Sequence, residues 1–182
     1  MQVMKKQPLG QQILLSQLKG MIIFDRHDLR PLGLIESVIF RSKNLQVAFL
    51  QCLSGGSTNY IRADQTAVVK NLLTIPGAEC FGEKEDFIRE KATFEQDCRL
   101  LDYKVCDMSG KKLGNIEDCS IKLPLMNADR LYVRRPLLKS LHQGSLILPT
   151  TAIQDVQPDK KLLVVQSEVA ATKKAAIKPL AA

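Results

Sequence analysis

Five cysteines and two histidines are the residues of this sequence that could bind a metal, form disulfides or act as nucleophiles. The cysteines stand at positions 52, 80, 98, 106 and 119, and the histidines are His27 and His142. The number of cysteines is odd and no Cys-x-x-Cys pair occurs, which argues against a disulfide framework and a zinc site. We therefore expect no metal and no cofactor. Cys106 and Cys119 are predicted to lie in strands as small apolar side chains.

Four carboxylates occupy matching places in two segments: Asp25 matches Asp107, and Glu36 matches Glu117. Paired carboxylates can serve as general acid and base where their surroundings separate their pKa values. Nothing around these residues indicates such surroundings, and acids at strand ends commonly accept hydrogen bonds from turn amides. Dinucleotide, phosphate-loop and nucleophile-elbow motifs are absent from the sequence. We therefore expect a protein that is not an enzyme.

Basic residues near position 130 could bind an anionic partner. Leu131 and Val133 alternate with Arg130, Tyr132 and Arg134. This period of two residues is typical of a half-buried strand. Guanidinium groups bind phosphate with two hydrogen bonds, and an interleaved tyrosine can stack on a base. The alternative is an ordinary solvated strand face with charged turns. The candidate partner-binding residues are Arg130, Tyr132, Arg134, Arg135, Lys111 and Lys112.

The composition is that of a globular protein. Of the 182 residues, 45% are hydrophobic and 25% are charged, and no apolar run approaches the length of a membrane span. The net charge is +7, of which +5 falls in residues 91–182, so anionic partners are favoured. The polar residues that follow Lys5 and Lys6 do not resemble the apolar core of a secretory signal, so we expect a cytoplasmic protein.

An internal repeat provides the strongest information about the fold. Residues 18–25 match residues 100–107 at an offset of 82, and residues 32–36 match residues 113–117 at an offset of 81. Six aligned pairs are identical, whereas average residue usage gives about one or two. Short apolar runs separated by turn residues surround both copies, which predicts strands. Gly114 within such a strand indicates a bulge, and the segment 53–57 is predicted to form a hairpin loop.

We predict an all-β protein with two tandem small antiparallel β-barrels joined by a short helical linker. Closing each sheet into a barrel would remove its exposed edges. The linker is rich in helix formers, and Phe87 and Phe94 are among the residues of its apolar stripe. The predicted parts are an N-terminal extension (1–13), a first barrel (14–81), the linker (82–97), a second barrel (98–168) and a basic tail (169–182).

The order strand, Asp, turn, Leu-Gly, Ile, acidic residue resembles the PRC-barrel family, which is named for the photosynthetic reaction centre. The match is best over residues 103–118, where Gly110 lies in the turn. The first copy keeps Asp25 and Gly33 but has no glycine in the turn 26–31. The resemblance implies small six-stranded barrels that hold macromolecules together instead of turning over a substrate.

The resemblance predicts a non-enzymatic adaptor or scaffold that binds another protein or protein complex. Family members act in a photosynthetic membrane complex, in ribosome maturation and in cell division, so a photosynthetic or other membrane-associated complex is one expected setting. The alternative is an accessory protein for RNA binding or ribosome assembly that uses the basic face of the second barrel. The sequence does not decide the oligomeric state.

Overall fold

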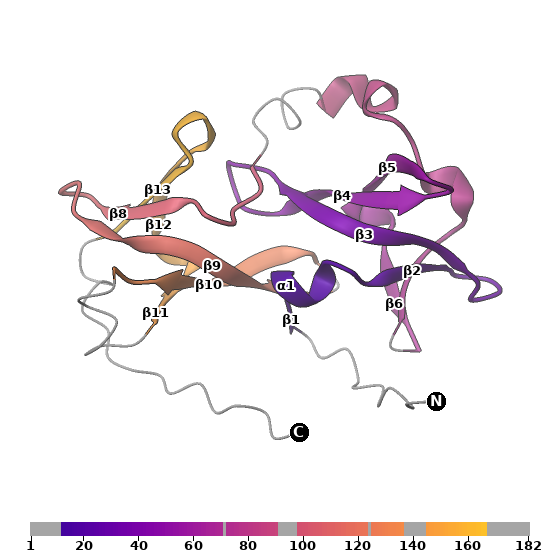
Figure 1. Cartoon of the computed structure of the whole chain (residues 1–182), viewed down its shortest axis with the longest axis horizontal. Coiled ribbons are helices and arrows are strands. Elements are labelled where there is room, and N and C mark those ends of the chain that lie inside the picture. The colour runs from indigo at the N-terminus through magenta and orange to yellow at the C-terminus, as the bar shows by residue number, and fades with distance from the viewer. Residues whose placement is uncertain (1–11, 71, 91–97, 124, 137–144, 167–182) are drawn as a thin grey trace. The chain divides into compact units, whose positions relative to one another are not determined.

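The computed structural model describes residues 12–70, 72–90, 98–123, 125–136 and 145–166, and strands dominate them (Figure 1). The first sheet consists of β2 (Ile22–Asp25), β3 (Pro31–Phe40), β4 (Val47–Ser54), β5 (Ser57–Arg62), β6 (Ala67–Val69) and β7 (Leu72–Ile75). The second consists of β8 (Lys104–Asp107), β9 (Lys112–Lys122), β10 (Asn127–Arg134), β11 (Leu146–Pro149), β12 (Ile153–Gln157) and β13 (Leu162–Val165), with β1 (Gln12–Leu14) paired to β9.

The helices between the strands are short. They are α1 (Leu15–Leu18) and the 3-10 helices η1 (Ala63–Gln65), η2 (Ala78–Cys80), η3 (Lys84–Glu90), η4 (Thr150–Ala152) and η5 (Pro158–Lys160). The prediction of an all-β protein is therefore confirmed. Among the described residues, no helix has the length and apolar character needed to cross a membrane.

The two sheets have the same strand order. The first runs β5-β4-β3-β2-β7-β6 and the second runs β11-β10-β9-β8-β13-β12. The sequence repeat aligns β2 with β8 and β3 with β9, and these strands pair alike: Ile22 lies opposite Leu34, and Lys104 lies opposite Asn115. The detected repeat thus covers the central hairpin of a sheet that occurs twice.

The prediction of two closed antiparallel barrels is wrong, because the described strands form two open sheets. Among the strands that the structure describes, no ladder joins β5 to β6 or β11 to β12, and each sheet has one parallel pair, β2 with β7 and β8 with β13. The parallel pair arises because β7 returns beside β2 only after four intervening strands. Helix η1 separates β5 from β6 along the chain.

Each central hairpin contains a bulge beside a glycine. The pairing of β2 with β3 shifts between Ile23 and Phe24, and that of β8 with β9 shifts between Val105 and Cys106. A Cβ on Gly33 would lie 2.9 Å from the carbonyl oxygen of Leu53, and one on Gly114 would lie 2.2 Å from that of Arg134. The predicted bulge is confirmed, and the repeated glycine allows the neighbouring strand to approach closely.

The hairpin loop predicted at residues 53–57 is present. Ser54 pairs with Ser57, and Gly55 and Gly56 between them have φ angles of 59° and 82°. Two successive positive φ angles are typical of the tight turn that joins twisted strands, and glycine adopts them without steric cost. The two glycines therefore form a turn between β4 and β5.

The chain divides into two compact units whose boundaries differ from the predicted ones. The first comprises Met1–Arg99 with Cys119–Asp129, and the second comprises Leu100–Asp118 with Arg130–Ala182. Residues 119–129, which the prediction assigned to the second barrel, thus belong to the first unit. They are attached there by backbone hydrogen bonds, from Val47 N–H to the Met126 carbonyl and from Ala128 N–H to the Leu45 carbonyl.

The predicted linker helix takes a different form in its described part. Residues Lys84–Glu90 are 3-10 helical, and Phe87 within them has non-helical angles (φ −106°, ψ 43°). The Phe87 ring packs edge-on against Phe49, with ring centroids 5.0 Å apart. This contact with the first sheet explains why local helix propensity does not decide the conformation. Residues 91–97, with Phe94, and the tail 169–182 lie outside the described residues.

Candidate functional site

The repeated aspartates organise turns. The N–H of His27 donates to Oδ1 of Asp25 at 2.8 Å, and the N–H of Ser109 donates to Oδ1 of Asp107 at 2.9 Å. Oδ1 of Asp107 also accepts hydrogen bonds from the Ser109 hydroxyl at 2.5 Å and from the Lys111 N–H at 3.0 Å. Both carboxylates are buried and accept bonds from residues just after their strands. The prediction that the repeated acids bond to turn amides is confirmed for these two aspartates, whereas Glu36 accepts a hydrogen bond from the side-chain amide of Gln51 at 3.2 Å.

The turn lowers the pKa of Asp107. The largest cause is the hydrogen bond from the Ser109 hydroxyl; burial opposes it, and the backbone amides of Lys111 and Ser109 add to the lowering. A carboxylate with three donors stays ionised at neutral pH, so it has no proton to give to a substrate. These contacts support a structural role for Asp107.

None of the five cysteines forms a disulfide. Cys119 is fully buried, as predicted, whereas Cys106 is partly exposed on β8. Burial, together with the charge of Glu36, raises the pKa of Cys52 to about 12, so this thiol is protonated and unreactive at neutral pH. Within the described residues, no three or more His, Cys, Asp or Glu side chains stand close enough to hold a metal ion.

The basic strand predicted from the sequence is β10. Leu131 and Val133 are fully buried, while Arg130 and Arg134 are exposed and Tyr132 is half-buried opposite Ile147 of β11. The predicted alternation is therefore confirmed. The two arginines and the tyrosine lie on the outer face of the second sheet, opposite the face that forms the core.

Further basic residues of the second sheet lie on the neighbouring strands and turns. Lys112 is exposed at the start of β9, two residues before Gly114, whose backbone lies against Arg134. Lys111 precedes it in the exposed turn, and Arg135 follows β10 and is half-buried. Lys104, which the sequence reasoning did not select, is exposed on β8 opposite Asn115. These residues belong to the second unit, and we call Lys104, Lys111, Lys112, Arg130, Arg134 and Arg135 its basic group.

The equivalent place on the first sheet has three exposed apolar residues. Ile22, Leu34 and Leu53 lie side by side on β2, β3 and β4 and are 44%, 39% and 39% exposed. Their neighbours Ile23, Ile35 and Cys52 point to the opposite face and are fully buried. We call Ile22, Leu34 and Leu53 the apolar row.

The apolar row and part of the basic group occupy equivalent places in the duplicated sheet. The sequence repeat aligns Ile22 with Lys104 and Leu34 with Asn115. The backbone that approaches Gly33 is that of Leu53, and the backbone that approaches Gly114 is that of Arg134, which makes these two residues equivalent as well. Sequence reasoning found the basic residues but missed the apolar row. The repeat pairs apolar with polar residues at these positions, but only the strand pairing places the three apolar side chains next to one another.

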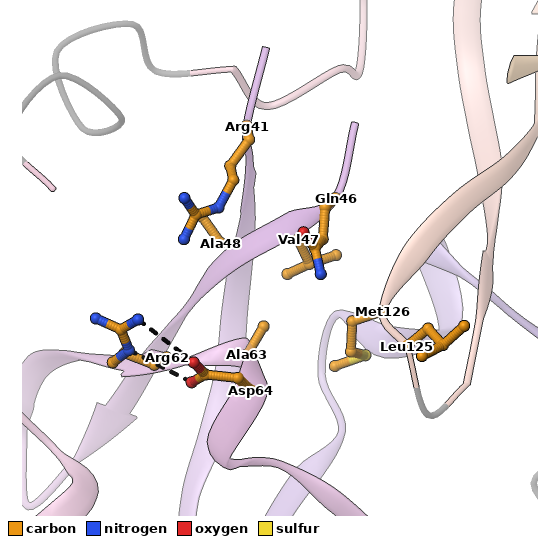
Figure 2. A pocket seen from close by; sticks show the side chains of 9 residues that line it. All are labelled: Arg41, Gln46, Val47, Ala48, Arg62, Ala63, Asp64, Leu125 and Met126. Atoms are coloured by element: carbon orange, nitrogen blue, oxygen red, sulfur yellow. Dashed lines mark hydrogen bonds and ion pairs between the residues drawn. The ribbon is translucent and has the colours of Figure 1, made fainter. Parts of the chain in front are cut away.

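The first unit also contains a pocket of about 320 Å³, shown in Figure 2. Arg41 lies on one side of it, and Arg62 with its partner Asp64 lies at its edge. The remaining lining residues are Gln46, Val47, Ala48, Ala63, Leu125 and Met126. No prediction from the sequence included this pocket, because its residues come from four separate segments of the chain.

The comparisons with known proteins assign no relative: no protein-family model matches the chain, and no curated protein matches it significantly.

Proposed function

We propose that this chain is a non-enzymatic adaptor of the tandem PRC-barrel type, which binds a protein partner through the outer face of its first sheet. The observation that carries the proposal is the apolar row, in which Ile22, Leu34 and Leu53 are adjacent and each more than a third exposed. Contiguous exposed apolar side chains are typical of surfaces that a partner covers.

The fold itself does not require apolar residues at these places. The second sheet has the same strand order with Lys104, Asn115 and Arg134 at the equivalent positions. A solvent-facing row can therefore be polar in this sheet, so the apolar residues of the first sheet need another explanation. Binding of an apolar surface of a partner protein provides one.

The test replaces Leu34 and Leu53 together by serine in the full chain. Fully burying a leucine side chain is worth about 1.5–3 kcal/mol, and covering the exposed part of each of these two contributes about 1 kcal/mol. Loss of both is expected to weaken binding of the purified partner about 30-fold. Because both side chains face solvent, the thermal midpoint is expected to stay within a few degrees of that of the unsubstituted protein.

Partners would first be identified by affinity purification of the native protein, with both protein and RNA analysed. A matched variant, Thr58→Ala, changes the exposed residue that follows Leu53 in the same row on β5. Equal capture of every protein by the Leu34→Ser/Leu53→Ser variant and the Thr58→Ala variant would contradict the proposal.

A second candidate function is RNA binding, or an accessory role in ribosome assembly, through the second sheet. It is favoured by Arg130 and Arg134, which are exposed on the same strand face as the half-buried Tyr132. Guanidinium groups bind phosphates, and a tyrosine between them can stack on an unpaired base.

This candidate is tested by titrating single-stranded RNA at several salt concentrations. We expect the affinity for RNA to fall steeply as the salt concentration rises. The Arg130→Ala/Arg134→Ala variant is expected to bind RNA with an affinity at least about tenfold lower. Binding that is absent, or that does not respond to salt, would remove this function.

A further inference from the structure

The two arginines that line the pocket of the first unit, Arg41 and Arg62, share one carboxylate, which lies outside the pocket lining. Oε1 of Glu90 on η3 lies 3.5 Å from Nη2 of Arg41 and 3.6 Å from Nη1 of Arg62. Charged hydrogen bonds between guanidinium and carboxylate groups are usually 2.7–2.9 Å long. Both contacts are therefore loose, and Glu90 is held by weaker bonds than the two arginines can form.

Arg62 is oriented by a different acid. Its Nε and Nη2 face the two carboxylate oxygens of Asp64 at 3.4 and 3.3 Å, so Nη1 is the nitrogen directed to Glu90. The side chains of Arg41 and Arg62 remain 39% and 38% exposed. A ligand from solvent can therefore reach both guanidinium groups without unfolding the sheet.

Apart from Gln46 and the carboxylate of Asp64, the other residues that line the pocket are apolar. Val47, Ala48, Ala63 and Met126 are buried, and Leu125 is 66% exposed beside them. Figure 2 shows Leu125 and Met126 on the side of the pocket away from the guanidinium groups. The ligand that matches this lining has a negative charge at one end and an aliphatic group at the other.

The shape of the wall depends on unusual backbone angles. Leu45 and Met126 have φ angles of 52° and 54° and are both buried. Left-handed angles cost a residue other than glycine about 1–2 kcal/mol. The bonds between the segments of these two residues hold that conformation and present Met126 to the pocket.

We infer that this pocket binds a carboxylate next to an aliphatic side chain in a partner protein, and that Glu90 occupies the carboxylate's place until the partner arrives. Glu90 itself shows which group the two arginines accept. A volume of about 320 Å³ lies at the lower end of the range for ligand pockets, which suits one residue of a partner better than a long peptide. The carboxylate can be the free C-terminus of a partner chain that ends in leucine. It can also be the side chain of an acidic residue that precedes a leucine.

The experiment measures binding of fluorescent peptides to the full chain. One peptide ends in leucine with a free carboxylate, a second is its C-terminal amide, and a third is the amide with glutamate before leucine. Binding of the first or third peptide, with no binding of the second, is expected and tells which source supplies the carboxylate. Equal binding of the second peptide would overturn the inference.

Substitution of Glu90 gives the sharpest test, because it is expected to increase the affinity for the peptide. Glu90→Ala removes the internal competitor and should tighten peptide binding about fivefold. Glu85→Ala, on the exposed side of the same helix, is the matched control and should leave it unchanged. If Glu90→Ala weakens binding or leaves it unchanged, Glu90 is only a structural ion pair.

Substitutions of the arginines and of Leu125 complete the design. Arg41→Gln should weaken binding about tenfold, whereas Lys43→Gln, the same loss of charge at an exposed residue outside the pocket, should not. Leu125→Ser should weaken binding of the peptides without destabilising the fold, since this side chain is exposed. Competition by inorganic phosphate as strong as that of the peptide, with no effect of Leu125→Ser, would overturn the inference.

This inference and the proposed function can fail separately. Val47 of the pocket and Leu53 of the apolar row are six residues apart on β4, which corresponds to about 20 Å along a strand. The Leu34→Ser/Leu53→Ser variant is therefore expected to bind the peptides as tightly as the unsubstituted protein. Loss of peptide binding in that variant would show that the two sites are not separate.

Discussion

Asp25 and Asp107 show how one residue type at one place can terminate a strand and organise the turn after it. Each accepts a bond from the amide two residues further along the chain. The two turns then differ, because the first is closed by a bond from the Asp25 N–H to the Arg30 carbonyl and the second by one from the Asp107 N–H to the Lys111 carbonyl. The repeated aspartate therefore tolerates a change of one residue in turn length.

The lowered pKa of Asp107 predicts a pH-dependent contribution to stability. A carboxylate with a folded pKa below its unfolded value stabilises the fold above the unfolded pKa, and this contribution is lost as the pH falls through the folded pKa. Asp107→Asn should therefore lower the thermal midpoint at pH 7, and the difference from the unsubstituted protein should narrow below about pH 4. Thermal unfolding followed by circular dichroism between pH 3 and 7 measures both.

Glu117→Gln is the control for this prediction, since Glu117 is the other repeated acid of the second sheet and is exposed on β9. The thermal midpoint of the Glu117→Gln variant should differ little from that of the unsubstituted protein at each pH. A difference between Asp107→Asn and the unsubstituted protein that is constant from pH 3 to pH 7 would contradict the stated cause.

At the scale of elements, the central hairpin of each sheet depends on its glycine. Gly33 and Gly114 follow the bulged position of the hairpin, where the next strand passes too close for a Cβ. Sequence alone could identify the glycine and the bulge. It could not identify the partner strand, because the order β4-β3-β2 and β10-β9-β8 is a property of the sheet.

Alanine at these glycines should destabilise the fold unequally. A Cβ on Gly114 would lie 2.2 Å from a backbone carbonyl oxygen, and one on Gly33 would lie 2.9 Å from one. Forcing atoms into such space costs about 1–3 kcal/mol, so we expect Gly114→Ala to lower the free energy of unfolding by that amount and Gly33→Ala by less. Urea unfolding measures the loss.

Lys112→Ala is the control for the glycine substitutions, because it also leaves an alanine on β9, but at an exposed position that already has a Cβ. It should change the free energy of unfolding by less than about 0.5 kcal/mol. If the Gly114→Ala variant has the same free energy of unfolding as the Lys112→Ala variant, the close approach of the strands does not explain the repeated glycine.

At the scale of the whole molecule, duplication has produced two sheets with one strand order and different outer faces. Ile22 and Leu34 correspond to Lys104 and Asn115, while the buried residues of both copies remain apolar, as at Ile35 and Ile116. The core constrains one face of a sheet through packing, and solvent leaves the other free to change. The two faces therefore differ in chemical character.

Under the two proposed functions, protein binding through the first sheet and RNA binding through the second are expected to be separable. The Leu34→Ser/Leu53→Ser variant should lose the protein partner and keep RNA binding, and the Arg130→Ala/Arg134→Ala variant should do the reverse. Pull-down of the purified partner and RNA titration on the same two preparations measure this. If both variants lose both partners, the two faces act together as one surface.

The sequence by itself determined the all-β class, the duplication, the alternation along residues 130–134 and the role of the repeated aspartates, because these depend on side-chain period and on hydrogen bonds between near neighbours. Tertiary structure decided the open sheets, the parallel pairs, the unit to which residues 119–129 belong, the apolar row and the arginine pocket. Each of these depends on which distant segments pair. That choice follows from burial summed over the whole chain, and no local pattern of residues specifies it.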